Sequence, residues 1–200
     1  MSLSSLHEWK NLANDILREY ESLSQKFSTF QNKNQLSCLE GCGRCCFKDD
    51  IYCSPIELLP MALYLLESNK VDEYLNRLEN PEHPYCTFLE ITDKESFKGF
   101  CREYQHRAII CRTFGVSARK TKDLKVDYSV CKTIKEKKPQ AYSQLIQAFN
   151  HLEEEIPYIS SSKNNLLALS PKFMEQEYPI NQSLRIMLDK VLLISSFTIE

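Results

Sequence analysis

The chain has 200 residues, of which 42% are hydrophobic and 26% charged, with a formal net charge of −2. This length and composition predict one globular domain over residues 1–200 and exclude a disordered chain. The small net charge argues against nucleic acid as a partner, and no apolar run reaches the roughly 20 residues that cross a membrane. The N-terminus has no basic start followed by an apolar segment, so we expect no signal peptide and a cytoplasmic protein.

The N-terminal segment, residues 1–34, predicts one long helix. From Leu6 onward, apolar residues recur at alternating steps of three and four, which places them on one helical face. The helix should end near residues 31–34. Its apolar seam should pack in the core; the seam consists of Leu6, Trp9, Ala13, Ile16, Tyr20, Leu23, Phe27 and Phe30.

The central segment, residues 35–131, begins with a cysteine-rich loop and continues into short helices. Ser54-Pro55-Ile56-Glu57 predicts a helix start, because serine caps, proline suits the first turn and glutamate three residues later completes a capping box. That helix should run through Leu66 and stop at Asn69. A second short helix should follow over residues 71–78.

Residues 84–130 predict less regular structure. Residues 85–91 are typical of a strand, residues 92–95 of a turn, and residues 99–104 of a returning strand, which together form a short β-hairpin. Residues 107–112 predict a helical turn that carries Cys111. Gly115 should allow the chain to bend.

The C-terminal segment, residues 132–200, predicts helices. A second long helix should start at Lys132 and pack on the first one, with an apolar seam at Tyr142, Leu145, Phe149, Leu152 and Ile156. Pro157 and the serines at 160–162 should break it, and residues 184–194 should form a last amphipathic helix. The expected fold is therefore mainly α, with long terminal helices that frame an irregular cysteine-rich metal-binding core.

Nine cysteines give the strongest functional signal. In a reducing compartment, clustered thiols favour metal ligands or catalytic groups over disulfides, and an odd number cannot pair completely. Four of them follow C-x3-C-x2-C-C spacing in a loop where Gly41 and Gly43 flank Cys42, which is too dense for ordinary core packing. With Cys53 left aside as a buried thiol, the predicted ligands are Cys38, Cys42, Cys45, Cys46, Cys86, Cys101, Cys111 and Cys131.

Eight thiols are twice the four that a structural zinc ion or an iron–sulfur cluster takes. If the backbone is extended at Cys45 and Cys46, their side chains point to opposite sides, which favours two metal centres over a single one with spare thiols. The sequence does not decide between zinc and iron, and iron includes an iron–sulfur cluster. Accessory ligands are less favoured than cysteine and would be His83, His106, Asp49 and Asp50. Nearby cations could offset the thiolate charge: Arg44, Lys48, Arg102, Arg107 and Arg112.

The ordered motifs resemble the YkgJ-type cysteine-cluster family, which is described as a zinc- or iron-chelating domain. The resemblance covers about Cys38 to Cys131. It rests on the Cys42-x2-Cys45-Cys46 core preceded by Cys38, and on further motifs at Ser54-Pro55-Ile56-Glu57, Cys86-Thr-Phe-Leu89, Cys101-Arg-Glu-Tyr104, Arg107, Cys111-Arg-Thr-Phe-Gly115 and Cys131. Such a resemblance implies metal chelation without a defined reaction.

Two functional hypotheses follow. The first is a metal-binding protein without enzymatic activity. The second is an iron–sulfur redox or modifying enzyme, because Cys38-x3-Cys42-x2-Cys45 matches the spacing of radical S-adenosylmethionine enzymes, and flagellin lysine methylases carry a similar cysteine cluster. The predicted helices after the motif and the absence of a glycine-rich nucleotide loop favour the first hypothesis.

Overall fold

Helices dominate the computed structural model, which describes residues 5–80, 82–120, 126–148, 157–170 and 176–197. Helices hold 59% and strands 13%, which confirms the mainly α prediction. The chain divides into two compact units. Unit 1 comprises residues 1–18, 41–108 and 166–200, and unit 2 comprises residues 19–40 and 109–165.

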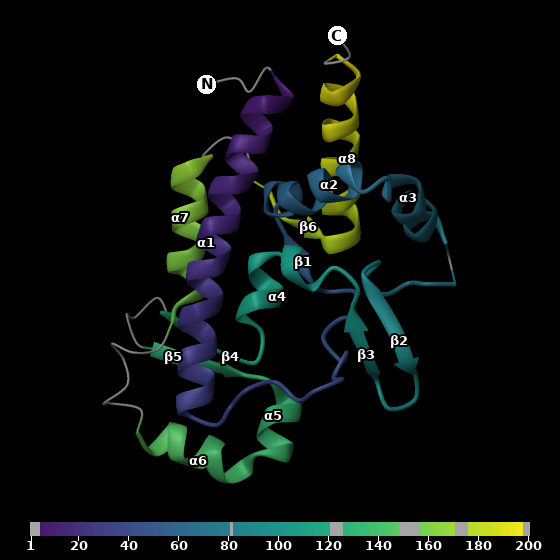
Figure 1. Cartoon of the computed structure of the whole chain (residues 1–200). Helices are drawn as coiled ribbons and strands as arrows, with labels where there is room; N and C mark the ends of the chain where they lie inside the picture. Colours follow the sequence, from purple (N-terminus) through teal and green to yellow (C-terminus); the bar gives the residue numbers. More distant parts are fainter. Residues whose placement is uncertain (1–4, 81, 121–125, 149–156, 171–175, 198–200) are drawn as a thin grey trace. The chain divides into compact units, whose positions relative to one another are not determined.

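The first helix, α1 (Leu6–Lys33), has the length that the apolar seam predicts (Figure 1). Seven of the eight seam residues are buried, and only Leu6 is partly exposed. Trp9, Ala13 and Ile16 lie in the part of α1 that belongs to unit 1. The remaining seam residues, from Tyr20 to Phe30, contribute to unit 2. The 3.6-residue period therefore located this helix correctly.

In unit 1, the predicted capping box opens a 3₁₀ turn, η1 (Pro55–Leu58), before helix α2 (Leu59–Glu67) begins. The buried Glu57 carboxylate accepts a hydrogen bond from the backbone N–H of Ser54 at 3.0 Å. A single α-helix from Pro55 was expected, but Pro60 has no N–H to offer Ile56, so the first turn stays 3₁₀. Asn69 adopts φ 55° and ends this stretch, as predicted, and α3 (Val71–Glu79) follows.

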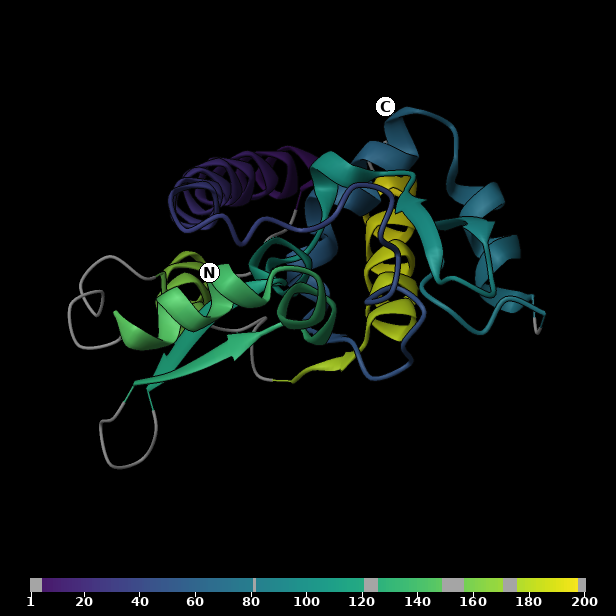
Figure 2. The same ribbon diagram turned by 90° about the horizontal axis from the view of Figure 1, so that it is seen from below.

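Helix α8 (Ile180–Ser196) extends the predicted C-terminal helix by one turn at its start. Strand β6 (Tyr178–Pro179), the yellow-green arrow in Figure 2, leads directly into it. This strand pairs antiparallel with β1 (Tyr52–Cys53). The buried face of α8 contacts η1, α2 and α3. This apolar face anchors the helical part of unit 1; it includes Leu184, Met187, Leu188 and Val191.

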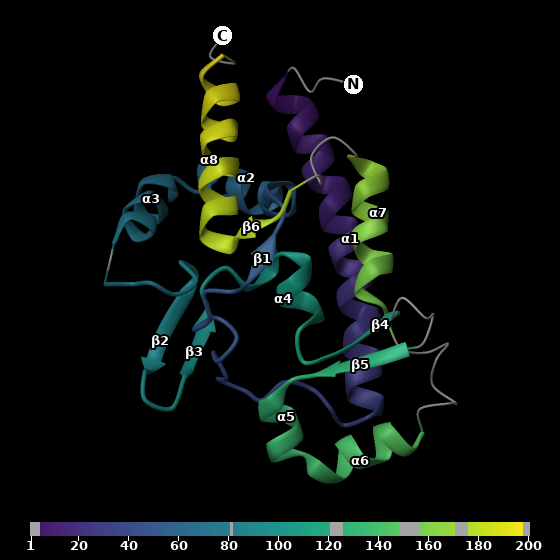
Figure 3. The same cartoon turned by 180° about the vertical axis from the view of Figure 1, so that it is seen from behind.

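The predicted hairpin is present as β2 (Leu89–Asp93) and β3 (Lys98–Cys101), followed by the 3₁₀ turn η2 (Tyr104–His106) (Figure 3). Its first strand starts four residues later than predicted, because the backbone N–H of Leu89 bonds to the carbonyl of Cys86 at 2.9 Å and closes a turn there. Cys101 pairs with Leu89 at the open end of the hairpin.

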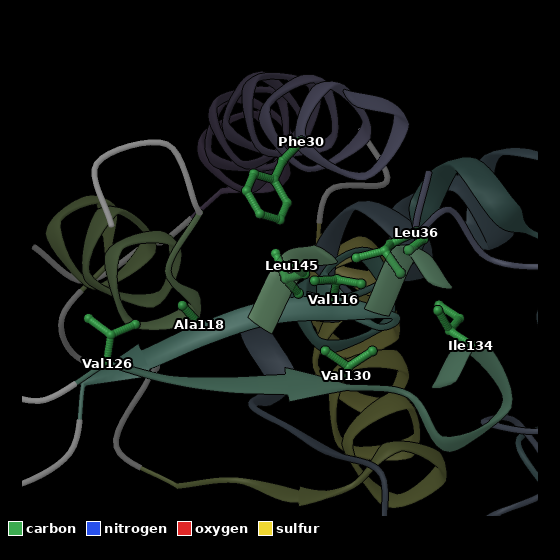
Figure 4. Close-up of a cluster of buried hydrophobic side chains, with 9 residues drawn as sticks. Phe30, Leu36, Val116, Ala118, Val126, Val130, Ile134 and Leu145 are labelled. Atoms are coloured by element: carbon green, nitrogen blue, oxygen red, sulfur yellow. The ribbon is translucent and has the colours of Figure 1, made fainter. Parts of the chain in front are cut away.

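Unit 2 contains the predicted turn of helix that carries Cys111, α4 (Ile109–Thr113), and an unpredicted hairpin. Its strands are β4 (Val116–Lys120) and β5 (Val126–Val130). Gly115, at φ 108°, makes the predicted bend before β4. Phe30 of α1 and Leu145 lie on the same side of this hairpin, and the Phe30 ring points toward it (Figure 4). This core confirms that the helices after Lys132 pack on the first helix; it includes Leu36, Val116, Ala118, Val126, Val130, Ile134 and Ala141.

The prediction of one long helix from Lys132 is wrong. Two helices stand there, α5 (Lys132–Lys137) and α6 (Pro139–Gln147). Pro139 prevents the residue before it from staying helical, and Lys138 has φ −130°. Phe149, Leu152 and Ile156 of the predicted seam lie outside the described residues.

The expected break at the three serines is also wrong. They form the first turns of α7 (Ile159–Leu169). Serine is tolerated near a helix N-terminus, where its hydroxyl can bond the backbone, and Ser162 Oγ donates to the carbonyl of Tyr158. No helix in the described ranges is long and apolar enough to cross a membrane.

Candidate metal centre

The cysteine loop of unit 1, defined here as residues 41–48, lies along the free edge of β3 (Figure 3). The backbone N–H of Gly99 donates to the carbonyl of Gly41 at 3.1 Å, and the N–H of Gly43 donates to the carbonyl of Phe97 at 3.2 Å. Cys42 forms an isolated antiparallel bridge with Lys98 between these two bonds. The hairpin thus gives the loop a fixed backbone support.

Close approach explains a glycine at position 99. A β-carbon there would lie 2.5 Å from the carbonyl oxygen of Glu90 and 2.8 Å from Leu89 Cδ1. A β-carbon at Gly43 would lie 3.1 Å from the backbone nitrogen of Gly99. Position 99 therefore requires a residue without a side chain, because β2 passes close to it, whereas a side chain at position 43 would require the loop or β3 to shift by a few tenths of an ångström.

Cys45 and Cys46 lie in a tight turn of this loop. The backbone N–H of Cys46 donates to the carbonyl of Gly43 at 2.7 Å, and the two Sγ atoms are 3.8 Å apart. The extended backbone that we expected at this pair is therefore wrong, because hydrogen bonding within the turn curls the chain. Both sulfurs point into one site, which removes the argument for two separate centres.

Two further thiols lie beside this pair. The backbone N–H of Cys86 donates to the carbonyl of Cys46 at 3.1 Å, and the Cys86 thiol acts on Cys46, whose pKa it raises. Cys101, at the end of β3, interacts electrostatically with both Cys45 and Cys46. Of the eight predicted ligands, these four share one neighbourhood in unit 1. We call Cys45, Cys46, Cys86 and Cys101 together the thiol site.

Three thiols of the site, those of Cys45, Cys46 and Cys101, favour the protonated form in the metal-free protein. The hydrogen bond between the Cys45 and Cys46 thiols raises the pKa of Cys45, and burial raises it further. That same bond lowers the pKa of Cys46, but the bond to Cys86, burial and the charges of Cys86 and Cys101 together raise it to about 12. Burial also raises the pKa of Cys101, against the backbone N–H of Glu103 and the Arg107 guanidinium, which lower it. A metal must therefore displace protons to bind here.

Two residues that sequence reasoning missed hold the segment around Cys86. Asn181 on α8 accepts a hydrogen bond from the N–H of Thr87 at 2.9 Å and donates to the carbonyl of Tyr85 at 2.8 Å. Arg77 on α3 donates to the carbonyls of Thr87 and Leu89, both at 2.9 Å. Neither residue belongs to a recognisable motif, so no sequence signal marks them.

Glu103 fixes the chain on the other side of Cys101. Its buried carboxylate accepts hydrogen bonds from Lys70 Nζ at 2.9 Å and from Tyr74 Oη at 3.0 Å. Its backbone N–H donates to the Cys101 sulfur. The two partners come from α3 and from the residue before it, so this network ties the end of β3 to the helices of unit 1.

The other predicted ligands have different surroundings. Cys42 lies in the cysteine loop and is partly exposed, whereas Cys38, Cys111 and Cys131 belong to unit 2. Cys131 packs against the hydrophobic core of that unit, and Cys38 is exposed. Cys53 is fully buried in β1, where its carbonyl accepts a bond from Ser183 Oγ at 2.7 Å. This confirms the expected burial of the ninth thiol.

The candidate accessory groups have other contacts. His83 Nε2 lies 3.1 Å from the carbonyl oxygen of Cys86 and so donates to it, and the His106 ring stacks on Tyr64 at 4.3 Å. Asp50 pairs with Lys48 at 3.7 Å, and Asp49 is exposed.

The nearby cations differ in their relation to the thiols. Arg102 is paired with Glu73 at 2.9 Å, and Arg44 lies over the Phe97 ring. In unit 2, Arg112 lies over the Tyr20 ring and bonds Ser24 Oγ. Arg107, which stacks on Tyr104, also stabilises the charged form of Cys101 and so lowers the pKa of that thiol. It is therefore a candidate counter-ion for the thiol site.

In the part of the chain that the structure describes, no three Cys, His, Asp or Glu side chains converge closely enough to hold a metal ion as they stand. The close pair of Cys45 and Cys46, with Cys86 hydrogen-bonded to it, is the tightest arrangement of thiols that we find in unit 1. Comparison with known proteins adds no relative, because no family model, curated protein or solved structure matches this chain.

Proposed function

We propose that this protein binds one zinc ion through Cys45, Cys46, Cys86 and Cys101. The observation that carries the proposal is the 3.8 Å separation of Cys45 Sγ and Cys46 Sγ. Four Zn–S bonds of about 2.3 Å at tetrahedral angles place neighbouring sulfurs about 3.8 Å apart. The two adjacent thiols therefore already match one edge of the tetrahedron.

Cys86 and Cys101 supply the other two ligands. The backbone bond between Cys86 and Cys46 supports Cys86 as the third ligand, and the electrostatic interaction of Cys101 with Cys45 and Cys46 supports Cys101 as the fourth. We expect ion binding to draw these two side chains toward the pair. Four thiolates around Zn²⁺ leave a formal charge of −2, which Arg107 partly offsets.

The sulfur spacing favours a single ion over a four-iron cluster. In a four-iron cluster each cysteine binds a different iron, so the ligating sulfurs lie farther apart than a tetrahedral edge. The resemblance to the YkgJ-type family supports a zinc- or iron-chelating role of the same class. A structural ion of this kind joins the cysteine loop, the segment before β2 and the end of β3, so that its binding free energy stabilises the fold.

The test is metal analysis of protein purified without oxygen, in the wild type and in two matched variants. We expect one zinc ion per chain, with its loss in Cys45→Ser and its retention in Cys38→Ser, which removes an exposed thiol just before the loop. Loss of metal in both variants would contradict the proposed ligand set. A brown, iron-containing protein absorbing near 400 nm would favour the iron–sulfur enzyme hypothesis instead.

A further inference from the structure

We propose that Cys46 and Cys86 form a reversible disulfide when the thiol site meets a peroxide, and that this bond releases the zinc ion. The release of zinc rests on the proposed function, whereas the disulfide rests on the geometry of the two cysteines alone. The site would then be a place of oxidative modification as well as of metal binding.

The backbone brings these two residues to disulfide distance. A direct bond of 3.1 Å joins the N–H of Cys86 to the carbonyl of Cys46, and the Cys86 thiol acts electrostatically on Cys46. Residues joined by such a bond keep their α-carbons within about the 4.4–6.8 Å that a disulfide spans. The Asn181 and Arg77 hydrogen bonds hold the Cys86 segment in that position.

The closer sulfur pair is the poorer candidate. Cys45 and Cys46 are adjacent, so their α-carbons are about 3.8 Å apart across a trans peptide, below the range of an unstrained disulfide. The peptide bonds are trans here, since the described residues contain no cis bond. Cys46 therefore has one neighbour suited to share a metal with it and a different neighbour suited to form a disulfide.

The order of events follows from exposure. Cys86 is buried at 6% exposure, whereas Cys46 is partly exposed, so peroxide reaches Cys46 first. One peroxide oxygen transfers to the Cys46 thiolate, giving a sulfenic acid and, with one proton, a molecule of water. The Cys86 thiolate then attacks the Cys46 sulfur, forming the S–S bond and expelling hydroxide, which a second proton converts to water. The two sulfurs lose two electrons and hydrogen peroxide accepts them.

Disulfide formation removes two of the four zinc ligands. Cys45 and Cys101 remain, and two thiolates do not complete the tetrahedral set that holds zinc. The disulfide keeps the cysteine loop attached to the segment before β2, so the same two segments stay joined after the ion has left. A dithiol reductant would reverse the change.

The test combines a zinc-release assay with peptide mapping. Zinc-loaded protein is treated with hydrogen peroxide, free zinc is followed with a chromogenic chelator, and the protein is alkylated and digested with trypsin. Cleavage after Arg44, Lys48, Arg77 and Lys94 separates a peptide of residues 45–48 from one of residues 78–94. We expect these peptides cross-linked, two hydrogens lighter than their sum, and separated again by dithiothreitol.

Two variants of the metal-free protein, oxidised at about pH 10 because the raised pKa of Cys46 leaves little thiolate at neutral pH, identify the partner of Cys86. Cys45→Ser should keep the cross-link, and Cys46→Ser should lose it. A cross-link that persists in Cys46→Ser, or peroxide products limited to sulfinic acids, would overturn the proposal while leaving zinc binding intact. If the protein binds no zinc but still forms the bond between residues 46 and 86, the proposed function fails and the disulfide stands.

Discussion

Asn181 holds Cys86 from both sides along the chain. Its side-chain oxygen accepts from the N–H of Thr87, and its side-chain nitrogen donates to the carbonyl of Tyr85. One amide on α8 therefore fixes the backbone immediately before and after a proposed zinc ligand. The position of that ligand depends on a helix that begins almost a hundred residues later in the sequence.

We expect Asn181→Leu to weaken both the fold and zinc binding. The substitution leaves the N–H of Thr87 and the carbonyl of Tyr85 without their side-chain partners, at a cost of about 1–3 kcal/mol for each buried group left unpaired. Zinc affinity should fall because the Cys86 segment is less well held. Urea unfolding of the metal-free protein and zinc titration check this. Gln182→Leu, at the exposed neighbouring position, is the control and should change neither.

Gly99→Ala should destabilise the cysteine loop together with the hairpin. A methyl group there would overlap the carbonyl oxygen of Glu90 and the Leu89 side chain, so the strands or the loop must shift. Overpacking of this kind costs about 1–3 kcal/mol. The urea midpoint should fall and zinc should bind more weakly, whereas Lys98→Ala, at an exposed position next to it, should match the wild type. Equal midpoints for the two variants would contradict the backbone packing described here.

Removal of zinc should lower thermal stability by a large amount. An ion that binds only the folded chain stabilises it by about 4 kcal/mol when the free ion is present at a thousand times its dissociation constant. We therefore expect a chelator to lower the unfolding temperature of the wild type by many degrees and to leave that of Cys45→Ser unchanged. Differential scanning calorimetry with and without chelator measures this. An equal response of both proteins would show that the ion binds elsewhere.

Stability of the metal-free protein should fall at alkaline pH. The pKa of Cys46 is raised from 9.0 to about 12 in the folded chain, so the folded state holds this proton more tightly than the unfolded state does. The resulting stabilisation is complete below pH 9 and disappears as the pH rises from 9 toward 12. The unfolding free energy of the wild type should therefore be lower at about pH 11 than at pH 7, and this difference should be smaller in Cys46→Ala. The same alkaline loss in both proteins would assign the effect to other groups.

Local patterns predicted the helices well where one apolar face was long or one cap was clear. The seam from Trp9 to Phe30 defined α1, and the Ser54 and Glu57 pair located the start of η1. Patterns failed where a single residue changed the backbone. Pro60 kept one helical turn 3₁₀, and Pro139 divided a helix that the apolar spacing alone would have continued.

The thiol site was predicted in composition and not in geometry. The clustering of cysteines identified the loop. The assumption of an extended backbone predicted side chains of Cys45 and Cys46 on opposite sides, which is wrong because the Gly43 carbonyl accepts a hydrogen bond from Cys46 and closes a turn there. Asn181, Arg77 and Glu103 could not be found from the sequence, since their importance comes from long-range hydrogen bonds and not from any local spacing.

The support of the cysteine loop by β3 also affects how the protein behaves toward other copies of itself. The loop occupies the edge of β3 through the N–H of Gly99 and the carbonyl of Phe97. A loop that detaches leaves those groups open, and an open strand edge is a template on which a second chain can add a strand. If the protein binds zinc as proposed, loss of the ion should therefore favour self-association.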